Sequence, residues 1–184
     1  MNYTEQLKDE HKGIKLMLQI IGRICDMLES GKNIDPEHLE QIVEFIKVFA
    51  DQCHHAKEED LLFPAMEKAG IPREGGPIGV MLSEHTLGRT YVRKLGDAVG
   101  DYKAGNRQAS HTIIENARAY ITLLSQHIDK EDNVLYPMAD KLLPKEKQEQ
   151  LLKEFETIEN ERIGAGKHDE FHELLKQLKT VYLD

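Results

Sequence analysis

The sequence of 184 residues contains no tryptophan, only two cysteines and few aromatic residues, which make up 6% of the chain. Cys25 and Cys53 are too few for a disulfide framework and show no CxxC spacing, so we interpret them as buried thiols in a reducing compartment. A core of this composition consists mainly of Leu, Ile, Val and Met. The length fits one domain with a sizeable core.

Basic residues and long apolar runs are also scarce. The 24 Lys and Arg face 33 Asp and Glu, giving a formal net charge of −9. Phosphate binding needs a basic surface, so we expect no nucleic-acid partner. No apolar run approaches the ~20 residues that cross a bilayer, and the start MNYTEQLKDEH has no signal-peptide core. The sequence therefore predicts a cytoplasmic protein without a membrane partner.

Helical periodicity runs through almost the whole chain, and no β-alternation competes with it. Asp35-Pro36 is a helix-start signal, and Gly/Pro-rich segments separate the periodic stretches. Short loops between long amphipathic helices predict an all-α fold, an antiparallel up-down four-helix bundle at 1–142 with a C-terminal helical extension packed on it at 143–184. The expected helices are 4–29, 36–68, 78–104, 107–140, 145–162 and 167–182.

An internal repeat carries several of the nine histidines. HHAKEEDLLFP at 54–64 aligns without a gap with HIDKEDNVLYP at 127–137, an offset of 127 − 54 = 73 residues. Glu10-His11 and Glu84-His85 repeat at an offset of 84 − 10 = 74 residues. The order is therefore His, then His-x-x-x-Glu, then the same again.

Residues four apart share one face of a helix, so each histidine of the repeat points the same way as its glutamate. The periodicity places these residues on the apolar faces, where unpaired carboxylates are costly unless a cation neutralises them. Six inward ligand-type residues in a twofold repeat favour a metal site over satisfied core histidines. The candidate ligands are His11, His54, Glu58, His85, His127 and Glu131.

The neighbouring pair His55 and Glu59 has the same spacing as His54 and Glu58. Positions 128 and 132 are Ile and Asp, so this register has no matching pair in the second copy. We therefore expect His55 and Glu59 to be rotated away and more exposed. Four imidazoles and two carboxylates suit iron or manganese, with zinc left open, and six ligands suit two ions bridged by both glutamates.

With these paired HxxxE segments followed by LFP and LYP, and with Glu10-His11 and Glu84-His85, the chain resembles the hemerythrin-like, HHE cation-binding family over about residues 5–140. The resemblance implies a four-helix bundle that holds two iron ions in a non-haem, oxo- or hydroxo-bridged centre. It also implies that Glu58 and Glu131 bridge the irons, with the four histidines completing the site.

The sequence departs from the oxygen-carrying hemerythrins, in which the third helix offers two histidines one turn apart and one bridging carboxylate is an aspartate. Here Arg89 stands four residues after His85, and both bridges are glutamates. The site is therefore one or more histidines short, which favours binding of peroxide, O2 or NO, or a redox reaction, over reversible carriage. Candidates for a missing ligand are His168, His172 and Tyr120.

Other residues of the repeat, and the two remaining histidines, are not predicted to bind a metal. Lys57 and Lys130 fall off the inward stripe and are expected at the surface. Glu10 and Glu84 either orient a neighbouring histidine or are solvated. We expect the Phe-Pro and Tyr-Pro pairs to cap the end of the bundle, and the two remaining histidines, His38 and His111, to be exposed.

The main hypothesis is a di-iron protein that binds or reacts with a small oxidant or gas. Two alternatives are an iron-handling or iron-sensing protein without redox turnover, and a structural bundle with zinc. Family members that repair iron–sulfur clusters usually carry an N-terminal cysteine-bearing segment; this chain begins almost at the bundle, which makes that activity a less favoured expectation and leaves it open. The sequence leaves open whether the chain forms a homodimer.

Overall fold

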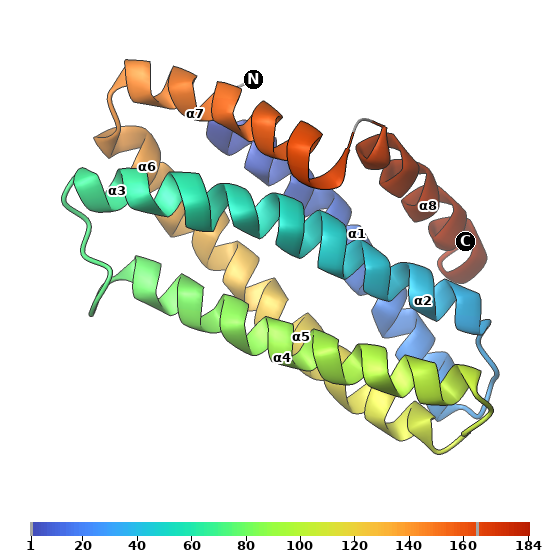
Figure 1. Ribbon diagram of the computed structural model, residues 1–184. Helices are drawn as coiled ribbons and strands as arrows, with labels where there is room; N and C mark the ends of the chain where they lie inside the picture. The colour runs from blue at the N-terminus through green and yellow to red at the C-terminus, as the bar shows by residue number, and fades with distance from the viewer. Residues whose placement is uncertain (1, 165) are drawn as a thin grey trace.

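The computed structural model describes residues 2–164 and 166–184, in which every regular element is helical (Figure 1). Four long helical runs lie side by side, and successive runs point in opposite directions (Figure 1). The prediction of an all-α helical bundle is confirmed. The runs are α1 (Tyr3–Glu29); α2 (Pro36–Phe45) with η1 (Ile46–His55), η2 (Glu58–Leu62) and α3 (Phe63–Lys68); α4 (Pro77–Lys103); and α5 (Ala109–Lys130) with η3 (Glu131–Leu135) and α6 (Tyr136–Leu142).

The helix boundaries follow from local signals in the sequence. Asn2 caps α1 by accepting from the backbone N–H of Glu5, and the Glu5 side chain returns a bond to the cap residue. Asp35 accepts from the backbone N–H of Glu37 at the start of α2, where proline occupies the first helical position. These starts and ends agree with the predicted boundaries within a few residues.

Both copies of the repeat contain a π-helical turn, which is wider than an α-helical one. Glu58 begins η2 and Glu131 begins η3. The backbone N–H groups of Phe63 and Tyr136 donate to the carbonyls of these glutamates, five residues earlier. A proline follows each aromatic residue, and the wide turn accommodates its missing N–H and bulky ring. The helices therefore continue through α3 and α6 instead of ending at the Phe-Pro and Tyr-Pro pairs.

The apolar core consists of two clusters separated by a polar layer. On α1, His11 lies between Leu7 of one cluster and Ile14 of the other. On the fourth run, His127 and Glu131 lie between apolar residues of the two clusters in the same way. The bundle thus brings the polar positions of all four runs to one level, enclosed by apolar residues on both sides.

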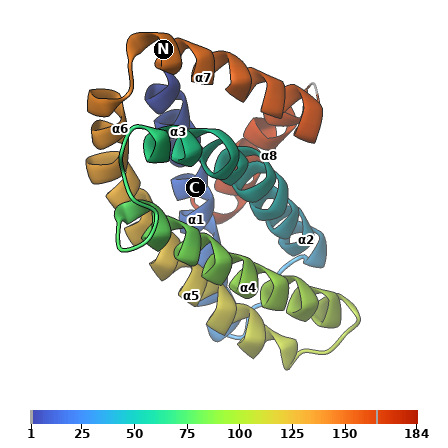
Figure 2. The same cartoon turned by 60° about the vertical axis from the view of Figure 1, so that its left-hand side comes forward.

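The C-terminal extension comprises α7 (Lys145–Ile158), η4 (Glu159–Ile163) and α8 (Lys167–Tyr182). It lies on the side of the bundle away from α4 in both views (Figures 1 and 2). Phe155 packs in one core cluster, and Phe171 and Leu175 pack in the other. Burial of each such side chain contributes about 1.5–3 kcal/mol, so the extension is held by the same apolar core as the bundle. The division into parts at 142/143 stays a prediction.

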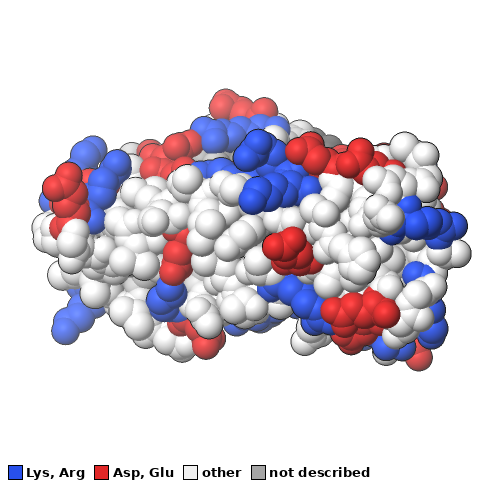
Figure 3. All heavy atoms as spheres, turned by 90° about the horizontal axis from the view of Figure 1, so that it is seen from below, with Lys and Arg blue, Asp and Glu red and all other residues white. Residues whose placement is uncertain are grey.

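The surface carries charges of both signs. On the face shown in Figure 3, acidic and basic side chains are interspersed and neither sign forms a continuous field. Among the described residues, no helix combines the length and the apolar character needed to cross a bilayer. The assignment to the cytoplasm stays a prediction.

Candidate metal centre

The structure brings all six predicted ligands together in the polar layer. The four histidines are 1–2% exposed and the two glutamates are fully buried. They come from α1, from η1 and η2, from α4, and from α5 and η3, so each of the four helical runs contributes at least one. Residues separated by up to 120 positions in the chain, from His11 to Glu131, therefore meet at one place.

The histidines form two pairs, and the glutamates lie between the pairs. The Nε2 atoms of His11 and His54 are 2.9 Å apart, and those of His85 and His127 are also 2.9 Å apart. Glu131 places Oε2 3.2 Å from His11 Nε2 and Oε1 2.9 Å from His127 Nε2, so it contacts one histidine of each pair. Glu58 Oε2 lies 3.4 Å from His85 Nε2 and 3.9 Å from His54 Nε2.

Each histidine of the two pairs is oriented by a carboxylate at its other ring nitrogen. The Nδ1 group of His54 donates to Glu10 at 2.7 Å, and that of His127 donates to Glu84 at 2.8 Å. An ionised carboxylate only accepts, so Nδ1 carries a hydrogen, and Nε2 is the ring nitrogen that faces the centre and can bind a metal. The sequence left open whether Glu10 and Glu84 orient a histidine or are solvated. These contacts support the orienting role.

The remaining histidine of each pair has an equivalent carboxylate that the sequence analysis does not identify. His11 Nδ1 donates to Asp132 at 2.7 Å, and His85 Nδ1 donates to Glu59 at 2.6 Å. Asp132 follows Glu131 and Glu59 follows Glu58, so each repeat supplies a central carboxylate and an orienting one in succession. That adjacency is the sequence signal that could have identified them.

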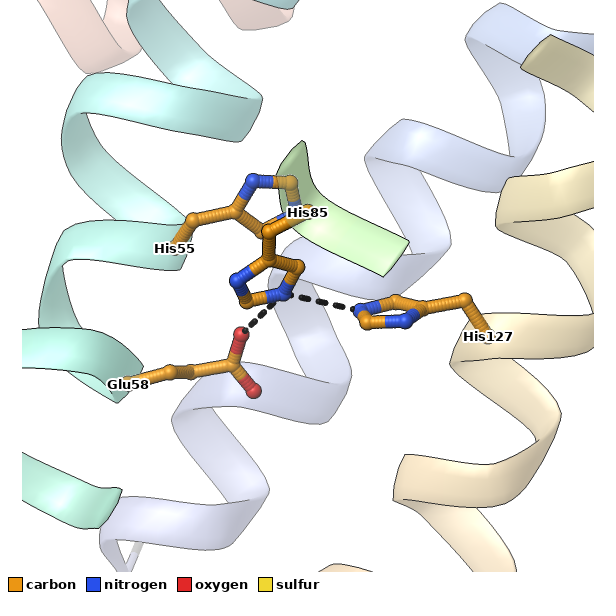
Figure 4. A group of neighbouring side chains, drawn as sticks. All are labelled: His55, Glu58, His85 and His127. Atoms are coloured by element: carbon orange, nitrogen blue, oxygen red, sulfur yellow. Dashed lines mark hydrogen bonds and ion pairs between the residues drawn. The ribbon is translucent and has the colours of Figure 1, made fainter. Parts of the chain in front are cut away.

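The expectation that His55 is more exposed is wrong. Its side chain is buried, and its ring stacks on that of His85 with centroids 3.8 Å apart (Figure 4). His55, Glu58, His85 and His127 offer ligand atoms that all lie within 4.8 Å of one another. The prediction assumed α-helical periodicity, but η1 is π-helical, and its wider turn lets two successive histidines reach the interior. The centre thus contains a fifth histidine.

The donor set fits a bound cation. Three buried carboxylate oxygens, Glu58 Oε2 and both oxygens of Glu131, have no well-formed hydrogen bond among the described residues. They face imidazole nitrogens instead, in a site of five histidines and two carboxylates. Buried carboxylates without donors are costly, and a metal ion satisfies them together with the nitrogen lone pairs.

The electrostatics of the protein chain hold these carboxylates ionised. Burial raises the pKa of Glu131, but the imidazoles of His127 and His11 outweigh burial and hold it well below its usual range. Burial lowers the pKa of His11, yet the carboxylates of Asp132 and Glu131 raise it to about 9. His85 behaves in the same way, with a pKa raised to about 9 through Glu58 and Glu59 against the effect of burial. Metal binding at such a site displaces protons.

His55 differs from the other histidines in its ionisation. Burial, followed by the nearby charge of His85, lowers its pKa well below the usual value. Its Nδ1 group donates to Asp51 at 3.2 Å, so the neutral ring also has an oriented Nε2. A neutral imidazole is the form that coordinates a metal.

The prediction that Lys57 lies at the surface is also wrong. Lys57 is fully buried and forms ion pairs with Glu10 and with Glu159 of η4. Its counterpart in the repeat, Lys130, pairs with Glu84, and its side chain is 41% exposed. The difference arises because the C-terminal extension covers Lys57. Lys57 thus connects the extension, through Glu10, to His54 of the centre.

Tyr136, which is not among the predicted additional ligands, reaches the centre, whereas the three predicted candidates do not. The Tyr136 hydroxyl donates to Glu58 Oε1 at 2.7 Å and lies 3.3 Å from His11 Nε2. His168 is half-buried beside Glu10 and Glu159, and His172 is exposed. Both lie outside the two ligand groups of the centre, which are His55, Glu58, His85 and His127, and His11, His54 and Glu131. Tyr120 is buried beside the centre, in a cavity wall.

The two remaining histidines lie outside the centre. His38, expected to be exposed, is half-buried and hydrogen-bonded to the Tyr182 hydroxyl, while His111 is exposed as predicted.

The fold and this donor set define a class of metal-binding helical bundles, and sequence comparison identifies the family. The family described as Hemerythrin HHE cation binding domain matches residues 2–139. The chain belongs to this family.

Among curated proteins, the uncharacterized protein Rv1995 of Mycobacterium tuberculosis (strain ATCC 25618 / H37Rv) is 25% identical over 162 residues, which cover 88% of this chain and 63% of the relative. The iron-sulfur cluster repair protein YtfE of Edwardsiella ictaluri is 28% identical over 140 residues, 74% of this chain and 61% of the relative. The chain therefore spans less than two thirds of the length of these relatives. No solved structure gives a significant match.

Proposed function

We propose that the chain is a non-haem di-iron protein that binds or reacts with a small oxidant or gas, namely O2, peroxide or NO. The observation that carries the proposal is the position of Glu131, whose two oxygens contact one histidine of each pair. A carboxylate placed in this way is suited to be shared by two ions. Membership of the HHE family supports iron as the metal, and manganese and zinc also suit the ligand set.

In this proposal, His11 and His54 hold one ion, His85 and His127 hold the other, and Glu58 and Glu131 lie between them. Iron held by these residues would supply redox chemistry toward the small ligand. The protein chain orients each imidazole through a carboxylate at Nδ1 and excludes bulk water with the apolar clusters on both sides.

Tyr136 holds a proton at the centre. Its hydroxyl donates to Glu58 Oε1, and the phenol is fully buried. Burial and the nearby carboxylates of Glu131 and Glu58 raise its pKa well above the usual value. The phenol therefore stays protonated and keeps one oxygen of Glu58 engaged, leaving Oε2 for a cation.

Metal analysis combined with visible absorption tests the proposal. Purified protein is expected to contain about two iron ions per chain and to show a visible band that changes when peroxide or NO is added. His54→Ala is expected to reduce the iron content and the band together. A colourless zinc protein whose spectrum ignores both reagents would contradict the proposal.

We further propose that His55 is a ligand of the ion held by His85 and His127. His55→Gln is expected to weaken binding of that ion by about 10–100-fold while the other ion is retained. The measurement is a competitive metal titration with a chromogenic chelator. His111→Gln is the control, because His111 is exposed on α5 and should leave both affinities unchanged. Equal affinities in the two variants would remove His55 from the ligand set.

A second candidate function is repair of iron–sulfur clusters, which the name of the YtfE relative suggests. It predicts that iron-loaded protein transfers iron to a damaged cluster protein and restores its cluster absorption. The oxidant-binding proposal predicts a spectral response to peroxide or NO without iron transfer. Measuring both in one iron-loaded preparation separates the two functions.

A further inference from the structure

A cavity of about 290 Å³ lies beside the metal centre, between η1, α4 and α5. His55, His85 and His127 line it, so it adjoins one of the two ligand groups. The remaining wall is largely apolar and includes Ile46, Gly88, Val92, Tyr120, Leu123 and Leu124. Its volume is close to the lower end of the ~300–1,000 Å³ typical of pockets for organic ligands. A diatomic gas does not need a space of this size.

The charged side chains that line the cavity differ in whether they have an ion-pair partner. Asp51 is engaged by Arg89 at 2.7 Å, and Glu84 is engaged by His127 and Lys130. These contacts neutralise the carboxylates of the wall.

Lys47 and Arg93 also line the cavity, and both are exposed. Neither forms an ion pair with any residue that the structure describes. The cavity therefore combines an apolar interior with two exposed basic side chains, neither of them in an ion pair among the described residues.

We propose that this cavity binds an organic monocarboxylate, with its apolar body against Val92 and Leu123 and its carboxylate at Lys47 and Arg93. Charge complementarity favours this occupant over a neutral apolar molecule, because a carboxylate can pair with the two cations whereas a neutral molecule gains nothing from them. The bound molecule lies next to the ligand group formed by His55, His85 and His127. Binding does not require a metal, so this inference stands or falls separately from the proposed di-iron function.

Calorimetric titration of the full chain with octanoate and with 1-octanol tests the proposal, in both iron-loaded and metal-stripped protein. Octanoate is expected to bind both preparations, and about tenfold more tightly than octanol, because only octanoate carries the charge that Lys47 and Arg93 recognise. Binding that occurs only in iron-loaded protein would assign the carboxylate to the metal and overturn the proposal. Absence of octanoate binding from both preparations would also overturn it.

Gly88→Leu tests the location by filling the cavity. A Cβ at Gly88 meets Tyr120 and Leu123 at 3.6 and 3.7 Å, which is ordinary contact, so a larger side chain must occupy the cavity beyond them. Octanoate binding is expected to weaken at least ~10-fold. Gly100→Leu is the matched control on the same helix, because a Cβ there meets nothing within 4 Å. Gly88→Ala, a smaller change, gives a partial loss and serves if the leucine variant fails to fold. Equal octanoate affinity in the Gly88 and Gly100 variants overturns the location.

The double variant Lys47→Gln/Arg93→Gln tests the charge recognition. Octanoate affinity is expected to fall about tenfold, whereas octanol affinity is expected to stay the same. Equal losses for both compounds would show that the cations do not recognise the carboxylate. Unchanged octanoate binding would lead to the same conclusion.

Discussion

Replacement of Glu131 by alanine is expected to abolish binding of both metal ions. Its two oxygens contact His11 and His127, which belong to different pairs, so one substitution removes a carboxylate contact from both histidine pairs. Glu58 remains, but its Oε2 lies near His85 and His54 and does not replace the contacts to His11 and His127. The metal content of purified protein, measured by elemental analysis, is expected to fall from about two ions per chain to near zero.

The control for this experiment is Asp129→Ala, an exposed acidic residue on α5 two positions earlier. It changes the net charge equally and should retain both ions. Glu131→Ala should also lose the visible absorption band and its response to peroxide. If the variant kept one ion at wild-type affinity, the two ligand groups would be independent and the shared carboxylate would be excluded.

Replacement of Lys57 by methionine is expected to lower the free energy of unfolding by about 3–5 kcal/mol. Methionine preserves the apolar stem, but it leaves the carboxylates of Glu10 and Glu159 without their shared cation. Glu10 is buried, so its charge cannot be compensated by water. The measurement is urea denaturation of metal-stripped protein, which separates this effect from any loss of metal.

Lys130→Met is the matched control, because Lys130 occupies the equivalent position of the repeat and pairs with Glu84. Its ammonium is partly exposed, so the expected loss is only about 0–1 kcal/mol. Similar losses in the two variants would contradict the interpretation that burial under the extension gives Lys57 its importance. A large loss of unfolding free energy in Lys130→Met alone would also contradict this interpretation.

The sequence specified the helices and the inward residues because both depend on local periodicity. Capping signals such as Asp35-Pro36 fixed the helix boundaries, and the repeat separated by 73 residues selected His54 with Glu58 and His127 with Glu131. A second copy of a ligand pattern is informative without any tertiary contact, since residues four apart share a helix face. All six predicted ligands accordingly meet in the structure.

Two of the sequence-based expectations failed where the local geometry departs from an α-helix or a distant segment intervenes. His55 was placed outside the centre because the repeat has isoleucine at the matching position, yet the π-helical turn of η1 directs it inward. Lys57 was placed at the surface because it leaves the inward stripe of its own helix. Glu159 pairs with the Lys57 ammonium together with Glu10, and it lies 102 positions later in the chain than Lys57.

The sequence by itself determined the all-α fold, the helix boundaries and the six residues that face the polar layer, because each depends on interactions within one helix or on the repeat. Only the tertiary structure decided how the imidazoles pair, which carboxylate orients each one, and where the cavity beside the centre lies. These features depend on the packing of separate helices and on the wide turns within them, and side-chain spacing along one helix does not specify either.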